Sequence, residues 1–335
     1  MTAGIGRRRF GAATLLLLCF FGIGGGSRAA HAEDAALLRG KHIVFVEPYG
    51  PGSVTNLPLA LMSAEIERVT GASVEVKSMG GSAGGTALDY LMTASKADKG
   101  SLDFVVLDLT SRLIAEMVGG GPQLLQVVQP VALLSTGASA ALVVSDRSPI
   151  KSIDDLLAQA RSRQLRIVHL GRKAAFGLEL AMLEKSFGLT FADKVVGTRA
   201  EGLAALASGE ADAGFLVTYT LLPSPDAPSP PVRPILTFGA ARNPGFPAVP
   251  TLKERSGNSG AAITTAIALF APRDMPKATV AAMAAAMERV AAEPEIQKAA
   301  ASHHFPLEVR PAAAVMAAMA RSERLIKAHA EYLDR

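Results

Sequence analysis

Cysteine is almost absent from this chain of 335 residues, where it occurs once, as Cys19. That residue falls inside a segment we interpret as an export signal, so the mature chain would contain none. Leu18 stands where lipidation of Cys19 would require a small residue, and we expect no lipid there. These absences exclude a disulfide, a thiolate nucleophile and a cysteine-bound metal from the mature protein.

The export signal is predicted from three features in the order that secretion requires. Arg7, Arg8 and Arg9 are followed by an apolar run from Ala12 to Ile23, and the small residues of Ala30-His31-Ala32 suit a signal peptidase. The run is too short to span a bilayer as a permanent anchor. We therefore predict a signal peptide over residues 1–32 and a mature chain beginning near Glu33.

An excess of basic charge is also absent once this segment is set aside. Of 34 Lys and Arg residues, the four at positions 7, 8, 9 and 28 lie in the signal, which leaves 30 against 30 Asp and Glu. A balanced charge gives no support for nucleic-acid binding. No later segment reads as a transmembrane span, because charged residues interrupt the Ala-rich stretches.

Motifs for cofactors and metals are missing as well. The mature chain has no P-loop and no dinucleotide fingerprint, and its histidines lack ligand spacing. We predict no cofactor, no metal site and no catalytic residue.

Short β-branched runs alternate with helical patterns, which favours an α/β architecture with mostly parallel strands. About 300 mature residues are enough for two domains. The predicted strands are His42–Glu47, Ser73–Ser78, Asp103–Leu109, Pro130–Ser135, Ala140–Ser145, Leu165–Leu170, Ala213–Val217, Arg233–Phe238 and Thr265–Ala271. The predicted helices include Pro58–Thr70, Ile153–Arg161, Glu201–Ser208, Lys277–Ala292 and Pro311–Tyr332.

Two glycine-rich turns dominate the motifs. Residues 48–56 (PYGPGSVTN) join the first strand to the first helix, and residues 80–86 (GGSAGGT) join the second strand to the second helix. Backbone N–H groups at a helix N-terminus favour an anion, and glycine lets the backbone approach it closely. Either turn alone would be ordinary, but two from adjacent units favour an anion-binding site.

The second turn also matches the G-x-S-x-G pattern of a serine hydrolase, with Ser82 as nucleophile. Asp212 and one of His303, His304 or His329 would complete the catalytic set. The pattern occurs early in the chain and no HGGG-like oxyanion loop is visible. The secreted hydrolase stays open as the alternative reading.

Several segments in order resemble the Bug family, the periplasmic receptors of tripartite tricarboxylate transporters. Pro51–Asn56 (PGSVTN) looks like the family's P-G-G-G-T-D loop, and Val249–Glu254 (VPTLKE) matches its V-P-T-x-x-E turn. The other similar segments are Ser82–Thr86, Pro130–Leu134, Ser208–Asp212, Ala271–Pro276 and Glu293–Ile296.

The resemblance implies a type II periplasmic-binding-protein fold, in which two α/β domains surround a ligand cleft. Domain 1 would comprise residues 33–135 and 238–335, and domain 2 residues 136–237. The chain would act as a monomer in the periplasm, bind a small carboxylate and pass it to a large and a small membrane subunit. A ligand-presenting sensory receptor would need the same closed form, so that reading also stays open.

The candidate ligand-binding residues follow from the two turns, from the strand ends and from this resemblance. They are Tyr49, Gly52, Ser53, Thr55, Asn56, Ser82, Ala83, Gly84, Thr86, Asp108, Arg172, Lys173 and Thr198.

The departures from the family pattern bear on the charge of the ligand. Asn56 stands where the family usually has Asp, and Arg172-Lys173 stands within the stretch that replaces the family's Gly/Ser-rich loop in domain 2. Loss of the negative charge predicts a mono- or dicarboxylate without an amino group. Arg172 or Lys173, if either faces the cleft, would offer a cation to a second carboxylate.

Overall fold

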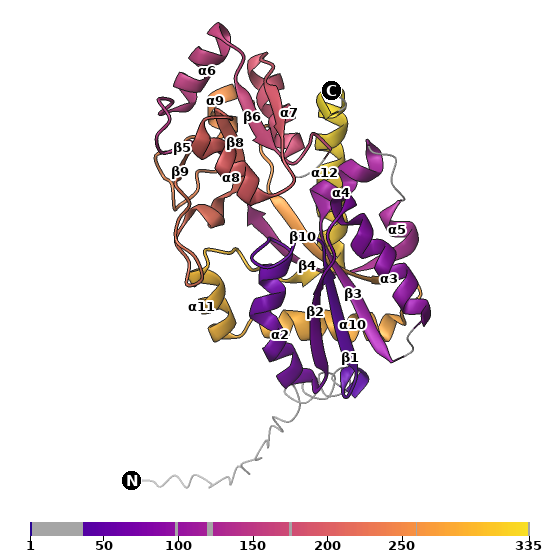
Figure 1. Cartoon of the computed structure of the whole chain (residues 1–335). Helices are drawn as coiled ribbons and strands as arrows, with labels where there is room; N and C mark the ends of the chain where they lie inside the picture. The colour runs from indigo at the N-terminus through magenta and orange to yellow at the C-terminus, as the bar shows by residue number, and fades with distance from the viewer. Residues whose placement is uncertain (2–35, 98–99, 119–122, 174–175, 259, 334–335) are drawn as a thin grey trace.

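The computed structural model describes residue 1 and residues 36–97, 100–118, 123–173, 176–258 and 260–333. The expected signal peptide and the expected mature start at Glu33 lie outside these residues. Figure 1 shows two α/β lobes, each built on its own sheet, with the last helix running alongside both. The α/β fold expected from the alternating pattern is confirmed.

Sheet A, the centre of domain 1, has the strand order β11-β4-β10-β3-β1-β2. Its strands are β1 (His42–Glu47), β2 (Ser73–Ser78), β3 (Ser101–Asp108), β4 (Val128–Ala138), β10 (Thr265–Pro272) and β11 (Arg310–Pro311). Its helices are α2 (Asn56–Thr70), α3 (Gly85–Ala97), α4 (Leu109–Met117), α5 (Leu124–Val127), α10 (Lys277–Ala291), α11 (Pro294–Ser302) and α12 (Ala312–Leu333), and a 3-10 turn η1 (Ser82–Gly84) precedes α3.

Sheet B, the centre of domain 2, has the order β7-β6-β8-β5-β9. Its strands are β5 (Ala140–Ser145), β6 (Arg166–His169), β7 (Ala192–Val195), β8 (Ala213–Val217) and β9 (Val232–Thr237). The helices are α6 (Ile153–Ser162), α7 (Gly177–Phe187), α8 (Arg199–Ser208), α9 (Leu252–Ser256) and the 3-10 turn η2 (Thr218–Leu221). The chain passes from sheet A to sheet B between β4 and β5 and returns between β9 and β10.

The sheets are mixed, so the expectation of mostly parallel strands is wrong. Strand β1 pairs in parallel with β2 and β3, and β6 does so with β7 and β8. Strands β4, β5, β9 and β10 pair antiparallel with their neighbours. The reason is the connectivity: the segments that cross between the sheets add β10 and β5 in the opposite direction to the βα units.

Most predicted elements lie where the periodicity placed them, because local signals fix their ends. Strands β1, β2, β5 and β8 have the predicted bounds, and α6 begins at the predicted Ile153, directly after its N-cap Ser152. The Ser152 hydroxyl accepts from Asp155 N, and the Asp155 carboxylate accepts from Ser152 N, as in a capping box. Strand β7, which the sequence analysis missed, has only four residues.

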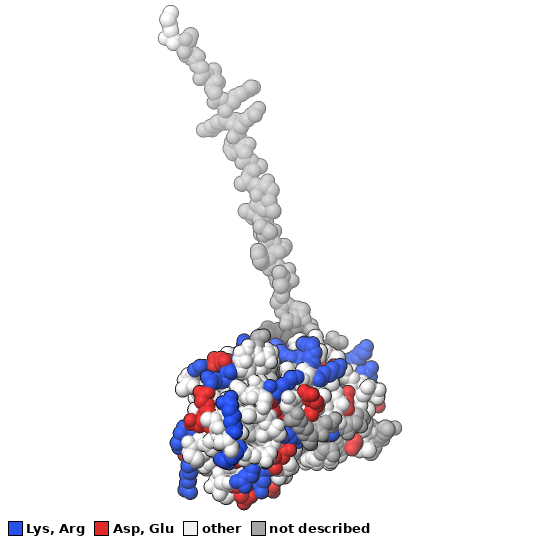
Figure 2. All heavy atoms as spheres, turned by 90° about the horizontal axis from the view of Figure 1, so that it is seen from above, with Lys and Arg blue, Asp and Glu red and all other residues white. Residues whose placement is uncertain are grey.

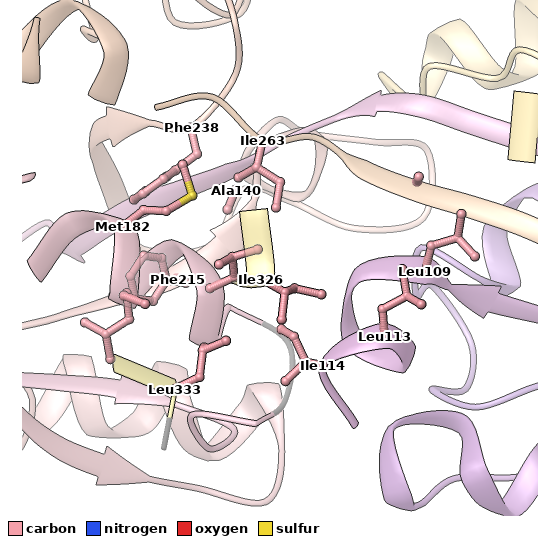
Figure 3. Close-up of a cluster of buried hydrophobic side chains, with 14 of the residues drawn as sticks. Leu109, Leu113, Ile114, Ala140, Met182, Phe215, Phe238, Ile263, Ile326 and Leu333 are labelled. Carbon is pink, nitrogen blue, oxygen red and sulfur yellow. The ribbon is translucent and has the colours of Figure 1, made fainter. Parts of the chain in front are cut away.

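One hydrophobic core connects the two domains through helix α12. Figure 3 shows Leu109 and Leu113 of α4 on one side and Met182, Phe215 and Phe238 on the other, with Ile326 of α12 between them. Helix α12 packs against α4 and β4 in domain 1 and against α7 in domain 2. The domains are therefore joined by packing as well as by the two crossing segments.

The surface is mixed in charge. Figure 2 shows basic and acidic side chains interspersed over one face of the molecule. In the part of the chain that the structure describes, no helix is long and apolar enough to cross a membrane. The same residues contain no cluster of three or more His, Cys, Asp or Glu side chains arranged to hold a metal ion.

Candidate functional site

A pocket of about 620 Å³ lies between the two domains. The carboxyl ends of β1 and β3 and the β2–α3 turn line it from domain 1, and the ends of β6 and β8, with the starts of α7 and α8, line it from domain 2. Crevices at the carboxyl ends of parallel strands are where α/β folds bind ligands, and the volume suits a small molecule. We take this pocket as the candidate site.

The first glycine-rich turn is organised around a buried carboxylate of the protein itself. Glu47, the last residue of β1, is fully buried and accepts hydrogen bonds from the backbone N–H groups of Tyr49 at 2.8 Å and Gly50 at 2.9 Å. The Thr55 hydroxyl donates to it at 2.9 Å, and the hydroxyls of Ser53 and Ser78 also donate. A carboxyl group of the chain itself therefore occupies donors that the sequence analysis had assigned to a ligand.

The second turn is closely packed where it approaches the first. A Cβ at Gly81 would lie 2.6 Å from the Thr86 hydroxyl, and one at Gly84 would lie 2.7 Å from Leu107 Cδ2. Both glycines have a positive φ, which other residues rarely adopt. The backbone can therefore pass directly beside the pocket, which Gly80, Gly81 and Ala83 line.

Asp108 closes the floor of the pocket at the end of β3. Its carboxylate caps α4 by accepting from Thr110 N at 3.0 Å and from the Ser111 hydroxyl at 2.7 Å. Burial raises the pKa of this carboxyl, and the two hydrogen bonds oppose that shift. The Tyr49 hydroxyl is hydrogen-bonded with Ser111, so Asp108, Ser111 and Tyr49 form one polar group.

Glu179 faces the same pocket from α7 in domain 2. It is only 6% exposed, and among the described residues its carboxylate is bonded to nothing but its own backbone N–H. Burial raises the pKa of Glu179 to about 7, and the neighbouring charge of Asp108 adds to the shift. An acid at this pKa can change protonation state near neutral pH.

Further polar groups of domain 2 come from β6, from the start of α8 and from η2, which adds Tyr219 and Thr220. His169 Nδ1 accepts from Gly171 N at 3.0 Å, which leaves the proton on Nε2, 3.2 Å from Asp193 Oδ1. Thr198 caps α8 by accepting from Glu201 N, and the Arg199 guanidinium lies 3.5 Å from the Thr220 carbonyl oxygen. Arg199 is an exposed side chain that also lines the pocket.

The structure brings together only part of the predicted site. The predicted residues that line the pocket are Tyr49, Gly52, Ser53, Ala83, Asp108 and Thr198. Thr55 is fully buried against Glu47, and Asn56 accepts from Gly52 N at 3.3 Å within its own turn. Gly84 is buried and Thr86 packs against Gly81, so neither lines the pocket. The side chain of Ser82 lies outside the described part of the chain.

Arg172 and Lys173 do not line the pocket either. The Arg172 guanidinium donates to Glu184 at 2.7 Å, to Asp193 at 2.8 Å and to the Tyr332 carbonyl oxygen at 3.2 Å. Arg172 is only 8% exposed, and these partners use its donors, so it joins α7, β7 and α12. Lys173 is exposed. The cation expected from this pair is therefore not available to a ligand in the pocket.

The partners required by the hydrolase reading do not converge. Asp212 accepts from Arg163 at 2.7 Å and from Arg166 N at 2.8 Å. His304 and His329 bond to main-chain carbonyl oxygens, and His303 lies near Asp226. In the described structure, no hydrogen bond or ion pair joins any of these histidines to Asp212.

The sequence analysis missed Glu47, Glu179 and Arg199. Glu47 follows a strand directly, which is a signal for a site in α/β folds. Glu179 and Arg199 carry no comparable signal, because each lies in the first turn of a helix and belongs to no recognisable motif. Their place in the pocket depends on how the domains pack.

Comparison with known proteins gives consistent matches. Residues 123–329 match the model of the family described as tripartite tricarboxylate transporter family receptor. A curated protein of Cupriavidus necator, described as a UPF0065 protein in the gbd 5′ region, is 26% identical over 67% of each chain.

Two solved structures show the fold. MatC of Rhodopseudomonas palustris, solved with bound malate, is 22% identical with a TM-score of 0.69 and covers 85% of this chain and 99% of its own. A second R. palustris protein, solved with adipate, is 20% identical with a TM-score of 0.73, and the match covers 86% of this chain and 96% of that one.

Proposed function

Because the chain belongs to the family of tripartite tricarboxylate transporter receptors, we propose that it is a periplasmic receptor that captures a small carboxylate and delivers it to a large and a small membrane subunit. The resemblance inferred from the sequence motifs is thereby confirmed at the level of the family. The observation that carries the proposal is the pocket of about 620 Å³ between two domains.

The dimensions and lining of the pocket support a small polar ligand. Pockets of 300–1,000 Å³ with a few convergent polar groups are typical of small-molecule sites. Relatives of the same fold were solved with malate and with adipate, both small dicarboxylates. We place the domain boundaries between β4 and β5 and between α9 and β10, and a cleft between two such domains can close by rotation of one domain on the other.

Groups on both sides of the pocket suit a ligand carboxylate. Arg199 offers a cation from domain 2, and its bond to the Thr220 carbonyl is long at 3.5 Å. Gly80 and Gly81 bring the backbone to the opposite wall. Because the backbone N–H groups of Tyr49 and Gly50 donate to Glu47, the first turn offers a ligand fewer donors than its glycines suggest.

Thermal-shift and calorimetric titration of the mature protein would test the proposal, with succinate, malate and adipate beside their amino-substituted counterparts. Saturable binding of at least one carboxylate is expected, and Arg199→Gln should weaken it at least tenfold. Absence of binding by every acid in both sets would contradict the proposal. For a carboxylate that binds, uptake measured in cells with and without the membrane subunits would separate transport from a sensory role.

The absence of catalysis is part of the proposal. A fluorophosphonate probe should leave Ser82 unmodified, because the candidate partners Asp212, His304 and His329 are engaged elsewhere. A stoichiometric adduct on Ser82, measured by intact mass, would favour the hydrolase instead.

A further inference from the structure

The pocket carries two buried carboxylates, one from each domain. Asp108, at the end of β3 in domain 1, is 8% exposed, and Glu179, in the first turn of α7 in domain 2, is 6% exposed. Both line the pocket, and they are close enough for the charge of Asp108 to act on Glu179. Two acids thus face one cavity from the two sides that closure would bring together.

The protein leaves Glu179 without a compensating group. Asp108 has three donors, the backbone N–H groups of Thr110 and Ser111 and the Ser111 hydroxyl, but its carboxylate oxygens can accept further hydrogen bonds. Glu179 has only its own backbone N–H among the described residues. Because Glu179 lines the pocket, a ligand that enters displaces water from its carboxylate, which then costs free energy unless it is protonated or the ligand supplies a donor.

Among the described residues, the neighbour whose charge acts on Glu179 is Asp108, and no cation does so. The lining residues that can carry positive charge are Arg199 and His169. His169 is held by Gly171 N and Asp193, and Arg199 lies against the Thr220 carbonyl. A metal ion is not favoured, because the described residues hold no cluster of three ligands.

We propose that the ligand carries a protonated amine that lies between Asp108 and Glu179, while its carboxylate is directed toward Arg199. The ligand class is therefore an amino carboxylate. This inference rests on the proposed function and narrows its ligand. The sequence predicted a ligand without an amino group, because Asn56 replaces the family's Asp. That prediction is reversed here, since Asn56 does not line the pocket whereas Asp108 and Glu179 do.

The geometry also gives the amine a part in closure. Two carboxylates facing each other across a cleft repel, and a cation between them turns that repulsion into attraction for both. An ammonium group has three donors, enough to reach a carboxylate on each wall at once. Closure would then depend on the amine, whereas a nitrogen-free acid would meet two negative charges.

Matched pairs of ligands test the inference by calorimetry: L-aspartate against succinate and L-glutamate against glutarate, followed by a thermal-shift screen of the other amino acids and their deaminated counterparts at about 10 mM. At least one amino acid should bind tenfold or more tightly than its nitrogen-free counterpart. Binding confined to nitrogen-free acids would overturn this inference and leave the proposed function standing. Binding by neither set would overturn both.

Variants locate the amine. Glu179→Gln should weaken binding of the amino acid at least tenfold and leave its nitrogen-free counterpart unchanged or tighter. Asp108→Asn should act in the same direction and serves as the second variant if Glu179→Gln does not fold. Glu210→Gln is the control, since Glu210 is an exposed residue that pairs with Lys194 outside the pocket. Equal losses for both ligands, or no loss for the amino acid, would overturn the inference.

Discussion

Glu47 and Glu179 are two buried glutamates beside the same cleft, and the protein treats them in opposite ways. Five donors surround Glu47: the backbone N–H groups of Tyr49 and Gly50 and the hydroxyls of Ser53, Thr55 and Ser78. Glu179 has none from its surroundings within the described chain. The first acid is satisfied by the fold itself, whereas the second is left for a proton or a ligand to satisfy.

Removing the satisfied acid should have the largest effect. Glu47→Ala would leave several buried donors without an acceptor, and we expect the free energy of unfolding to fall by about 4 kcal/mol. Urea denaturation measures this loss. Glu75→Gln, an exposed position on β2, is the control and should change stability by less than about 0.5 kcal/mol. A loss at Glu47 no greater than at Glu75 would show that the hydrogen bonds do not organise the turn.

Neutralising the unsatisfied acid should stabilise the empty protein at high pH. Glu179 has a pKa of about 7 in the folded state against an ordinary 4.5, so the folded chain holds the extra proton between these values and stability falls as the pH rises through them. Glu179→Gln should therefore raise the free energy of unfolding at pH 8 by up to about 3 kcal/mol and have little effect at pH 4.

Other titratable groups near Glu179 also contribute to the pH dependence of stability, so the measurement needs a control. Asp108 acts on Glu179 through its charge, and the other titratable groups that line the pocket are Tyr49, His169, Arg199 and Tyr219. Asp108 also has a raised pKa and contributes with the same sign. The difference between Glu179→Gln and the unchanged protein isolates Glu179, and Glu210→Gln should show no such pH dependence. A stability gain that is larger at pH 4 than at pH 8 would contradict the assignment.

Ligand binding should move a proton in a direction that identifies the ligand. An ammonium group beside Glu179 favours its ionised form, so binding near pH 7 should release up to about half a proton. A nitrogen-free dicarboxylate would raise the pKa further and take up a proton instead. Calorimetry in buffers of different ionisation enthalpy gives the sign directly. The Glu179→Gln variant should show neither release nor uptake from this group.

The smallest effect is expected at Lys173. Because this exposed residue does not line the pocket, Lys173→Ala should leave ligand affinity within about twofold. Titration of the variant with the ligand that binds the unchanged protein checks this. A tenfold loss of affinity would show that Lys173 contacts the ligand, as the sequence predicted.

These contrasts also explain which parts of the molecule could be predicted from the sequence. The glycine-rich turns and the strand ends were found because glycine content, alternation and the Ser152 cap are local signals. Arg172 was placed in the site because a basic residue after a strand is common there. Its real partners, Glu184 and Asp193, lie on other elements.

Burial created by domain packing has no local signal, which is why Glu179 was missed. Residues 177–187 carry no motif that marks Glu179, and only contact between α7 and the rest of the fold makes its carboxylate a buried group beside Asp108. The same holds for Glu47, because Ser78 on β2 and Thr55 at the start of α2 complete its surroundings. The sequence predicted the scaffold and the position of the cleft, but not its charge.

Helix α12 has a mechanical consequence for how such a cleft can close. The two crossing segments meet where Phe238 N donates to Ala140 O, and together they act as a pivot. Helix α12 is a third tether away from that pivot, because Lys185 and Arg172 of domain 2 hold its last turns through the carbonyl oxygens of Ala328 and Tyr332. A body held at a pivot and at one further point rotates most readily about the line that joins them. We therefore expect the lobes to twist about an axis that runs from the crossing segments toward the end of α12.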